Sequence, residues 1–180
     1  AARALWFYAG KLAWPANLSF IYPSWTVETR TARPIVPAAA ILAMLWALWL
    51  ARRKIGRAPL AATTAWALAL LPSLGFFDLQ PARQAFVADH FQYHAAAALI
   101  ALGVGTAAHW AKRTGWPGFS GTLGGGAILL AALGLMTWAR GAVFLDPELT
   151  WRDTIARNPR CAMCHKNLAA VLESSGRDGE

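Results

Sequence analysis

Two cysteines and a histidine near the C-terminal end are the residues whose types and spacing most clearly suggest chemistry. Cys161, Cys164 and His165 lie in the pattern Cys-Ala-Met-Cys-His. This spacing matches the attachment pattern of c-type haem, in which two thiols bond the haem vinyl groups and the histidine ligates iron. Only fifteen residues follow His165, and they include no Met or His for a second axial position. A chance spacing and a disulfide are the alternatives, although a disulfide across one helical turn would be strained.

A second polar group lies in the middle of the chain. Asp89, His90 and Tyr93 directly precede the apolar residues 95–110. One interpretation is that the Asp89 carboxylate caps a helix that begins there. The other is that this group contacts the anionic head group or sugar of a lipid, with Lys11 nearby, because a cation beside a helix N-terminus suits phosphate.

The chain that carries these residues is unusually apolar. Of its 180 residues, 57% are hydrophobic, 14% are charged and ten are tryptophans. An average soluble domain is roughly a quarter charged, so this composition excludes a disordered chain and favours an integral membrane protein. The net charge of +8 is then explained by loops that flank a membrane, and we expect no nucleic-acid partner.

Four apolar stretches approach the length of about 20 residues that a helix needs to cross a bilayer. None of them contains Asp, Glu, Lys or Arg. Buried helices of a soluble bundle would carry a polar face, which residues 38–50 lack. The four predicted spans are residues 35–51, 60–77, 95–110 and 123–139.

Charges in the loops predict the orientation. Residues 52–59 and 111–120 are basic, so the positive-inside rule places them in the cytoplasm of a bacterial inner membrane. Residues 1–34, 78–94 and 141–180 then face the periplasm.

The two ends of the chain are expected to be helical outside the bilayer. Residues 1–34 are rich in aromatic side chains and hold Lys11, which suits a short helix in the membrane interface. Two short helices are expected near the C-terminal end, one stopped by Pro159 and one from about Cys161 to Ser174. The predicted fold is therefore an all-α integral membrane protein with an interfacial segment (1–34), a four-helix transmembrane region (35–140) and a helical tail (141–180).

Three stretches resemble the C-terminal membrane portion of multispanning, TPR-containing glycosyltransferase-like proteins, which are GT-C relatives of protein O-mannosyltransferases. In the last stretch, Asn158 and Pro159 resemble the end of one tetratricopeptide repeat unit, and Cys161 and His165 suit the start of the next. Only Cys164 is then needed to create the haem pattern by accident. The stretches are LWFYAGKLAWPANLSFIYPSW (5–25), LPSLGFFDLQPARQAFVADHFQYHAAAAL (71–99) and WRDTIARNPRCAMCHKNLAAVLESSGR (151–177).

The resemblance implies transfer of a sugar from a polyprenyl-phosphate donor at the outer face. The acidic catalytic residues of that family lie in an early outer loop, to which nothing in this chain corresponds. We therefore expect the membrane part of such a protein without its catalytic segment. The chain starts without Met and ends like a helix cut short, which predicts a piece of a longer protein or a reduced relative.

Two other functions stay open. One is a non-catalytic accessory subunit of a larger membrane complex, for example an electron-transfer or photosynthetic assembly. Its tryptophan-rich helices would contact lipids and other membrane subunits. The other is a membrane-anchored monohaem c-type cytochrome, with haem held by Cys161, Cys164 and His165. Apart from that haem, we predict no cofactor, metal or catalytic residue.

Overall fold

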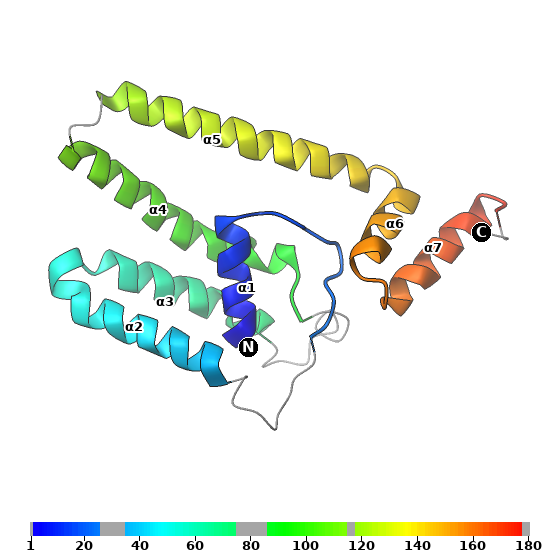
Figure 1. Cartoon of the computed structure of the whole chain (residues 1–180), viewed down its shortest axis with the longest axis horizontal. Coiled ribbons are helices and arrows are strands. Elements are labelled where there is room, and N and C mark those ends of the chain that lie inside the picture. The colour runs from blue at the N-terminus through cyan, green and yellow to red at the C-terminus, as the bar shows by residue number, and fades with distance from the viewer. Residues whose placement is uncertain (1, 26–34, 75–85, 115–117, 178–180) are drawn as a thin grey trace. The chain divides into compact units, whose positions relative to one another are not determined.

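Helices are the only regular secondary structure among the described residues, as predicted for an all-α protein (Figure 1). The structure is a computed structural model that describes residues 2–25, 35–74, 86–114 and 118–177. Its contacts form two units, Ala1–Leu18 with Ser24–Gly105 and Ser19–Pro23 with Thr106–Glu180. The helices are α1 (Ala2–Ala13), α2 (Ile35–Ile55), α3 (Ala58–Leu70), η1 (Leu71–Ser73), η3 (Asp89–Gln92), α4 (Tyr93–Thr114), α5 (Gly118–Gly141), η4 (Ala142–Phe144), α6 (Pro147–Arg157) and α7 (Ala162–Ser174).

Three helices of the described part are long and apolar enough to cross a bilayer. They cover Ile35–Ile55, Asp89–Thr114 and Gly124–Phe144. The expected second span is not confirmed, because the helix in that stretch is a shorter apolar one, Ala58–Ser73. Pro72 explains why α3 ends early, since proline lacks the N–H that would continue the α-helix. The end of that predicted span, residues 75–77, lies outside the described residues.

A tight reversal joins α2 to α3, and the two helices pack side by side (Figure 1). The last turn of α2 is basic, as the sequence indicated, with Arg52, Arg53 and Lys54. Gly56 follows with a φ of +87°, a left-handed conformation that glycine adopts without steric cost. The charge cluster therefore lies at the end of α2 itself, and the loop after it consists only of Gly56 and Arg57.

Helix α1 packs against the start of α2. Its buried residues Ala4, Leu5 and Tyr8 lie on one helical face. The indole Nε1 of Trp6 donates to the carbonyl oxygen of Pro37 at 3.1 Å. This is the short aromatic helix expected near the N-terminal end, and its place in the membrane interface stays a prediction.

Helices α6 and α7 form a packed pair in the second unit. The pair matches the two helices expected in the tail, and whether it starts a tetratricopeptide array stays a prediction. Asp146 caps α6, because its Oδ1 accepts the N–H of Glu148 at 2.8 Å. Gly176, with a φ of +70°, follows α7, and the N–H of Arg177 turns back to the carbonyl of Leu172 at 3.0 Å.

The reversal at Gly56 gives a stability test. Gly56→Ala should lower the free energy of unfolding by about 1 kcal/mol, because an L side chain is disfavoured at this positive φ. The matched control is Gly10→Ala in α1, where an added Cβ meets nothing within 4 Å. That change should raise stability by about 0.5–1 kcal/mol through helix propensity. Thermal unfolding in one detergent measures both, and shifts of the same sign would contradict the assignment.

Candidate functional site

A buried tyrosine joins α1 to the start of α4 in the first unit. The Tyr8 side chain is fully buried, and its hydroxyl accepts the backbone N–H of Ala88 at 3.1 Å. The backbone carbonyl of Tyr8 accepts Nε2 of Gln92 at 2.9 Å. These two hydrogen bonds fix α1 against a segment more than 80 residues later, which also carries the predicted polar group.

The environment of Tyr8 keeps its hydroxyl protonated. Burial raises the pKa of Tyr8, the N–H donated by Ala88 opposes that rise, and the negative charge of Asp89 adds to it. The net pKa lies above the ordinary value for tyrosine. The junction is thus a neutral hydrogen-bonded contact beside a carboxylate.

Asp89 does not cap the helix as the sequence suggested. The N-cap of η3 is Ala88, and no side chain caps this end. The chain enters α4 through a 3-10 turn, so the helical region starts one residue before the expected position and Asp89 falls inside its first turn. A carboxylate in a first turn still interacts favourably with the helix dipole.

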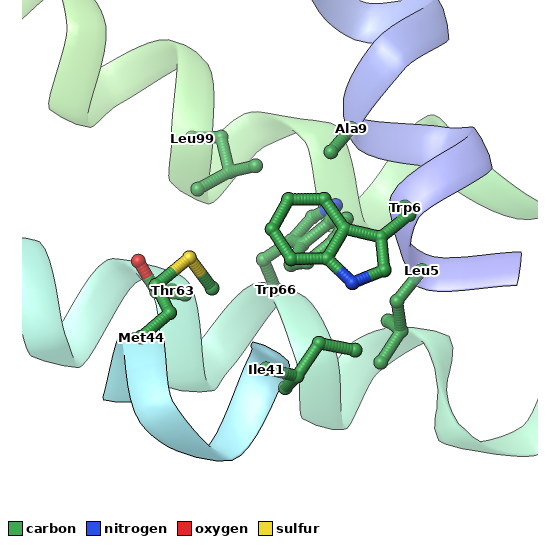
Figure 2. Close-up of a pocket in the computed structure, with 8 residues that line it drawn as sticks. All are labelled: Leu5, Trp6, Ala9, Ile41, Met44, Thr63, Trp66 and Leu99. Carbon is green, nitrogen blue, oxygen red and sulfur yellow. The ribbon is translucent and has the colours of Figure 1, made fainter. Parts of the chain in front are cut away.

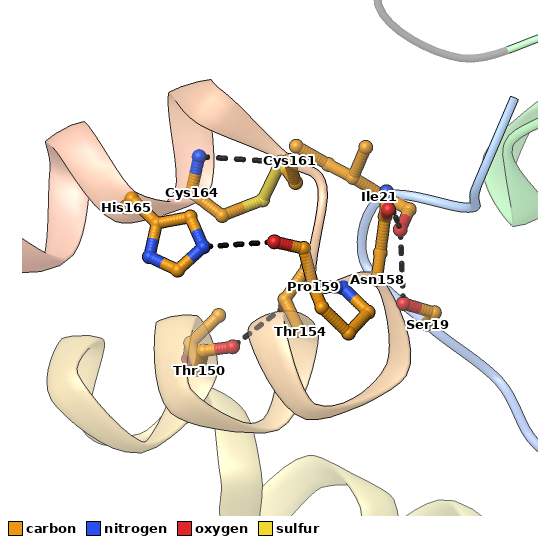
Figure 3. Close-up of a disulfide and its surroundings, with 9 residues drawn as sticks. All are labelled: Ser19, Ile21, Thr150, Thr154, Asn158, Pro159, Cys161, Cys164 and His165. Atoms are coloured by element: carbon orange, nitrogen blue, oxygen red, sulfur yellow. Dashed lines mark hydrogen bonds between the residues drawn. A yellow bond between two sulfur atoms is a disulfide. The ribbon is translucent and has the colours of Figure 1, made fainter.

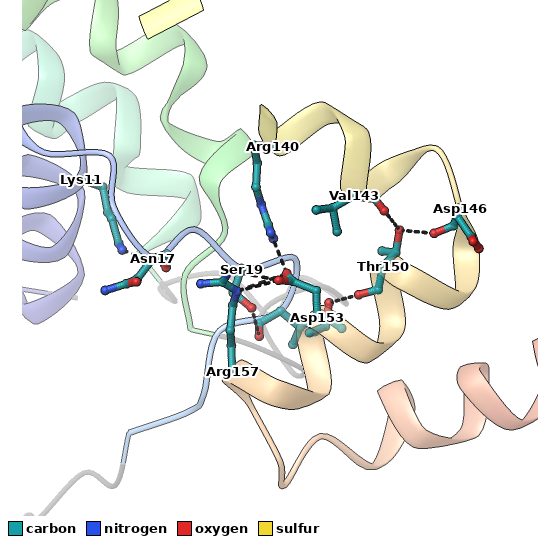
Figure 4. Close-up of polar contacts among 11 residues, drawn as sticks. Lys11, Asn17, Ser19, Arg140, Val143, Asp146, Thr150, Asp153 and Arg157 are labelled. Atoms are coloured by element: carbon teal, nitrogen blue, oxygen red, sulfur yellow. Dashed lines mark hydrogen bonds and ion pairs between the residues drawn. The ribbon is translucent and has the colours of Figure 1, made fainter. Parts of the chain in front are cut away.

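The other predicted lipid-contact residues separate into two places. His90 is exposed and packs edge-on to Phe91, with 4.5 Å between ring centroids, and Tyr93 is 74% exposed. Lys11 instead folds back on the end of its own helix, where its ammonium donates to the carbonyls of Ala16 and Asn17 (Figure 4). Asp89, His90 and Tyr93 therefore lie together at the start of one helical region, whereas Lys11 is hydrogen-bonded to the segment that follows α1.

Sequence reasoning missed Tyr8, and it placed Gln92 in the polar group with Asp89 and His90 without predicting its buried partner. Tyr8 lies within a run of aromatic residues, and Gln92 lies beside Asp89 and His90. Their partners are distant in sequence, so no local spacing signals the contact. The one available signal was a polar amide directly before an apolar span, where a buried hydrogen-bond partner is needed.

An apolar pocket lies between α1 and the helices α2, α3 and α4, within the first unit (Figure 2). Its volume is about 120 Å³, and it is partly open. Trp66 is 4% exposed, and no hydrogen-bond partner for its indole Nε1 occurs among the described residues. The lining residues are Leu5, Trp6, Ala9, Ile41, Met44, Thr63, Trp66 and Leu99.

Two arginines and one aspartate form the main ionic cluster of the second unit (Figure 4). Nη1 of Arg140 lies 2.6 Å from Oδ2 of Asp153, and Nη2 of Arg157 lies 3.0 Å from Oδ1. Burial works against ionisation of Asp153, but the hydrogen bonds and charges of both arginines outweigh it and lower the pKa of the carboxyl. The cluster ties the end of α5 to α6.

The two cysteines are joined by a disulfide (Figure 3). The expectation of strain assumed that both lie within one helical turn. Cys161 is instead the extended N-cap residue, with a φ of −77° and a ψ of 91°, and α7 begins at Ala162. The Cα atoms are 5.2 Å apart, which is an ordinary separation for a disulfide.

The same geometry does not fit a covalently attached haem. The side chain of Cys164 is fully buried and bonded to Cys161, whereas thioether attachment needs both thiols free beside the porphyrin edge. Nε2 of His165 lies 3.0 Å from the carbonyl oxygen of Pro159, to which it donates. Across the described residues, no group of three or more His, Cys, Asp or Glu side chains is placed to hold a metal ion.

Comparison with known proteins does not assign the chain to a family. No family model, no curated protein and no solved structure matches the chain.

The Tyr8 junction can be tested by removing one hydroxyl. Tyr8→Phe leaves the N–H of Ala88 without its acceptor and should lower the free energy of unfolding by about 1–2 kcal/mol. The control is Tyr93→Phe, which removes a hydroxyl from an exposed ring and should change stability by less than about 0.5 kcal/mol. Denaturant unfolding in detergent measures both. Equal effects would show that the junction does not stabilise α1.

The ionic cluster predicts a pH dependence of stability. Because the pKa of Asp153 is lowered on folding, its contribution is fully present above the unfolded value of about 3.9 and is lost as the pH falls through the folded pKa. Asp153→Asn should therefore destabilise the protein at neutral pH, and its difference from the wild type should shrink below about pH 4. A difference that stays constant across this pH range would contradict the assignment. Melting temperatures across pH check this.

Proposed function

We propose that the chain is the membrane part of a polyprenyl-phosphate-sugar-dependent glycosyltransferase-like TPR protein. In this proposal it holds the lipid-linked donor at the outer face and lacks the catalytic segment. The main support is the apolar pocket in the first unit, which four helices line with hydrocarbon and indole side chains. A hydrocarbon chain gains free energy from such a lining because its apolar surface stays out of water.

The size of the pocket defines what it can hold. An engineered cavity of about 150 Å³ lined by apolar side chains stays dry and binds benzene. At about 120 Å³, this pocket takes a short branched segment of an isoprenoid chain, and the rest of the chain stays in the bilayer.

The polar residues at the start of α4 support the same proposal. Leu99 lines the pocket and lies six residues after Tyr93, or about 9 Å along the helix at 1.5 Å per residue. Asp89, His90 and Tyr93 are therefore within reach of a phosphate or sugar whose lipid chain enters the pocket. The exposed His90 and Tyr93 provide donors for such a group, while the orientation of this end toward the periplasm rests on the charge pattern of the loops.

An accessory role in a larger membrane complex is the second proposal. It is favoured by α2 and the described part of α5, which contain no buried residue. Trp46 on α2 is 64% exposed, and Trp138 on α5 is 83% exposed. Large apolar side chains on a spanning helix suit either lipid or a neighbouring membrane subunit. Co-purification with another protein in fixed stoichiometry would favour this role.

Photolabelling in nanodiscs distinguishes a lipid-binding pocket from passive membrane helices. A polyprenyl phosphate that carries a diazirine should label α1 to α4, and unlabelled polyprenyl phosphate should compete while phosphatidylglycerol does not. Ala9→Leu fills the pocket and should reduce labelling roughly tenfold, since overpacking excludes a ligand of this size. The control Ala97→Leu adds the same side chain at an exposed position of α4 and should leave labelling unchanged. Equal loss in both variants, or equal competition by both lipids, would contradict the proposal.

A further inference from the structure

The disulfide at the start of α7 has two unlike sulfur atoms (Figure 3). Cys161 is partly exposed and occupies the N-cap position. Cys164 is fully buried against the rest of the helix pair. We therefore expect a thiol that approaches from solvent to meet the side chain of Cys161 rather than that of Cys164.

This bond contributes little to the stability of the fold. It joins residues only three apart, and a disulfide that closes so short a loop removes little entropy from the unfolded chain. The turn is also held without it. The carbonyl of Cys161 accepts the N–H of Cys164 at 3.0 Å and the N–H of His165 at 3.2 Å. Reduction would therefore leave the start of α7 in place.

The surroundings of Cys161 stabilise the reduced form as a thiolate. Its Sγ accepts the backbone N–H of Cys164 at 3.2 Å. It also lies at the N-terminus of a 13-residue helix, where the partial positive charge of the helix dipole favours an anion. Arg160 precedes it in the chain. A helix N-terminus, a Cys-X-X-Cys spacing and a neighbouring cation are the features that activate cysteines for exchange.

We propose that Cys161 and Cys164 form a thiol–disulfide exchange site that accepts electrons from an exposed protein dithiol. Because Cys161 is partly exposed and Cys164 is buried, we assign Cys161 as the attacked residue and Cys164 as the leaving thiol. This site is in the second unit and is independent of the lipid pocket.

The exchange proceeds in two balanced steps. A thiolate of the dithiol attacks Sγ of Cys161, a mixed disulfide forms, and the bond to Cys164 breaks with its electron pair on Sγ of Cys164, which takes up a proton. The second thiol of the dithiol loses its proton and attacks the mixed disulfide. Cys161 leaves as a thiolate, the dithiol has become a disulfide, and the cysteine pair has gained two electrons.

The first experiment uses the unmodified full chain in detergent. Dithiothreitol is added to the folded protein and to the protein unfolded in urea, and free thiols are counted over time. The proposal expects the folded protein to be reduced at least as fast as the unfolded one, because the attacked residue is partly exposed and its environment favours the thiolate product. Reduction that occurs only after unfolding would show a purely structural bond and overturn the proposal.

Two single-cysteine variants test the roles of the sulfur atoms. Cys164→Ser keeps the exposed thiol, and Cys161→Ser keeps the buried one. With glutathione disulfide, Cys164→Ser should form a mixed disulfide roughly tenfold faster than Cys161→Ser, because reactivity follows exposure and thiolate content. Circular dichroism confirms that both variants stay folded. Equal rates in folded variants would overturn the assignment.

The pH dependence of alkylation supplies a further readout. In Cys164→Ser, the rate of reaction with iodoacetamide should have its midpoint below the value of about 8.5 for a free cysteine. Arg160→Gln should move this midpoint upward, and Lys166→Gln serves as the control for removal of a positive charge on α7. A midpoint at or above that of free cysteine would show that the N-terminus of α7 does not activate Cys161 and would overturn the proposal.

Discussion

The hydrogen bonds of Tyr8 are the constraint on which the first unit depends. They hold α1 against the turn before α4, and α1 supplies Leu5, Trp6 and Ala9 to the apolar pocket. The contact is neutral and buried, so it is worth most where water is excluded. Hydrophobic packing alone would let α1 slide on the apolar helices, whereas two directed hydrogen bonds fix its position along them.

The second unit is held by a different kind of interaction. Asp153 joins two arginines, and ion pairs of this kind suit a region that water reaches. Neutral hydrogen bonds add to this cluster. Asn158 donates to the carbonyl of the sequence-distant Ile21 at 3.4 Å, and Thr154 donates to that of Thr150 at 2.7 Å.

Composition and periodicity were sufficient to predict the helices but not their partners. The bounds of α6 and α7 follow from Pro159 and Gly176, which act locally. The contact of Tyr8 with Ala88 spans 80 residues and leaves no local pattern. The predicted second span is not confirmed, because the apolar helix in that stretch covers only Ala58–Ser73 and Pro72 interrupts its backbone hydrogen bonding. The expected strain of the disulfide depended on whether Cys161 lies inside α7. A shift of one residue in the start of the helix decides this, and sequence alone does not place helix ends so finely.

The shortness of α3 has a consequence for the bilayer itself. With the 3-10 turn that follows it, the apolar helix covers Ala58–Ser73 and rises about 25 Å, against a hydrocarbon thickness of about 30 Å. If this helix enters the bilayer beside α2, the deficit would draw the lipid surface inward around it, since thinning relieves the mismatch at modest cost. Such a depression beside Trp66 would shorten the path of a polar head group toward the pocket. A single proline, by ending α3 early, would thus also change the local thickness of the bilayer.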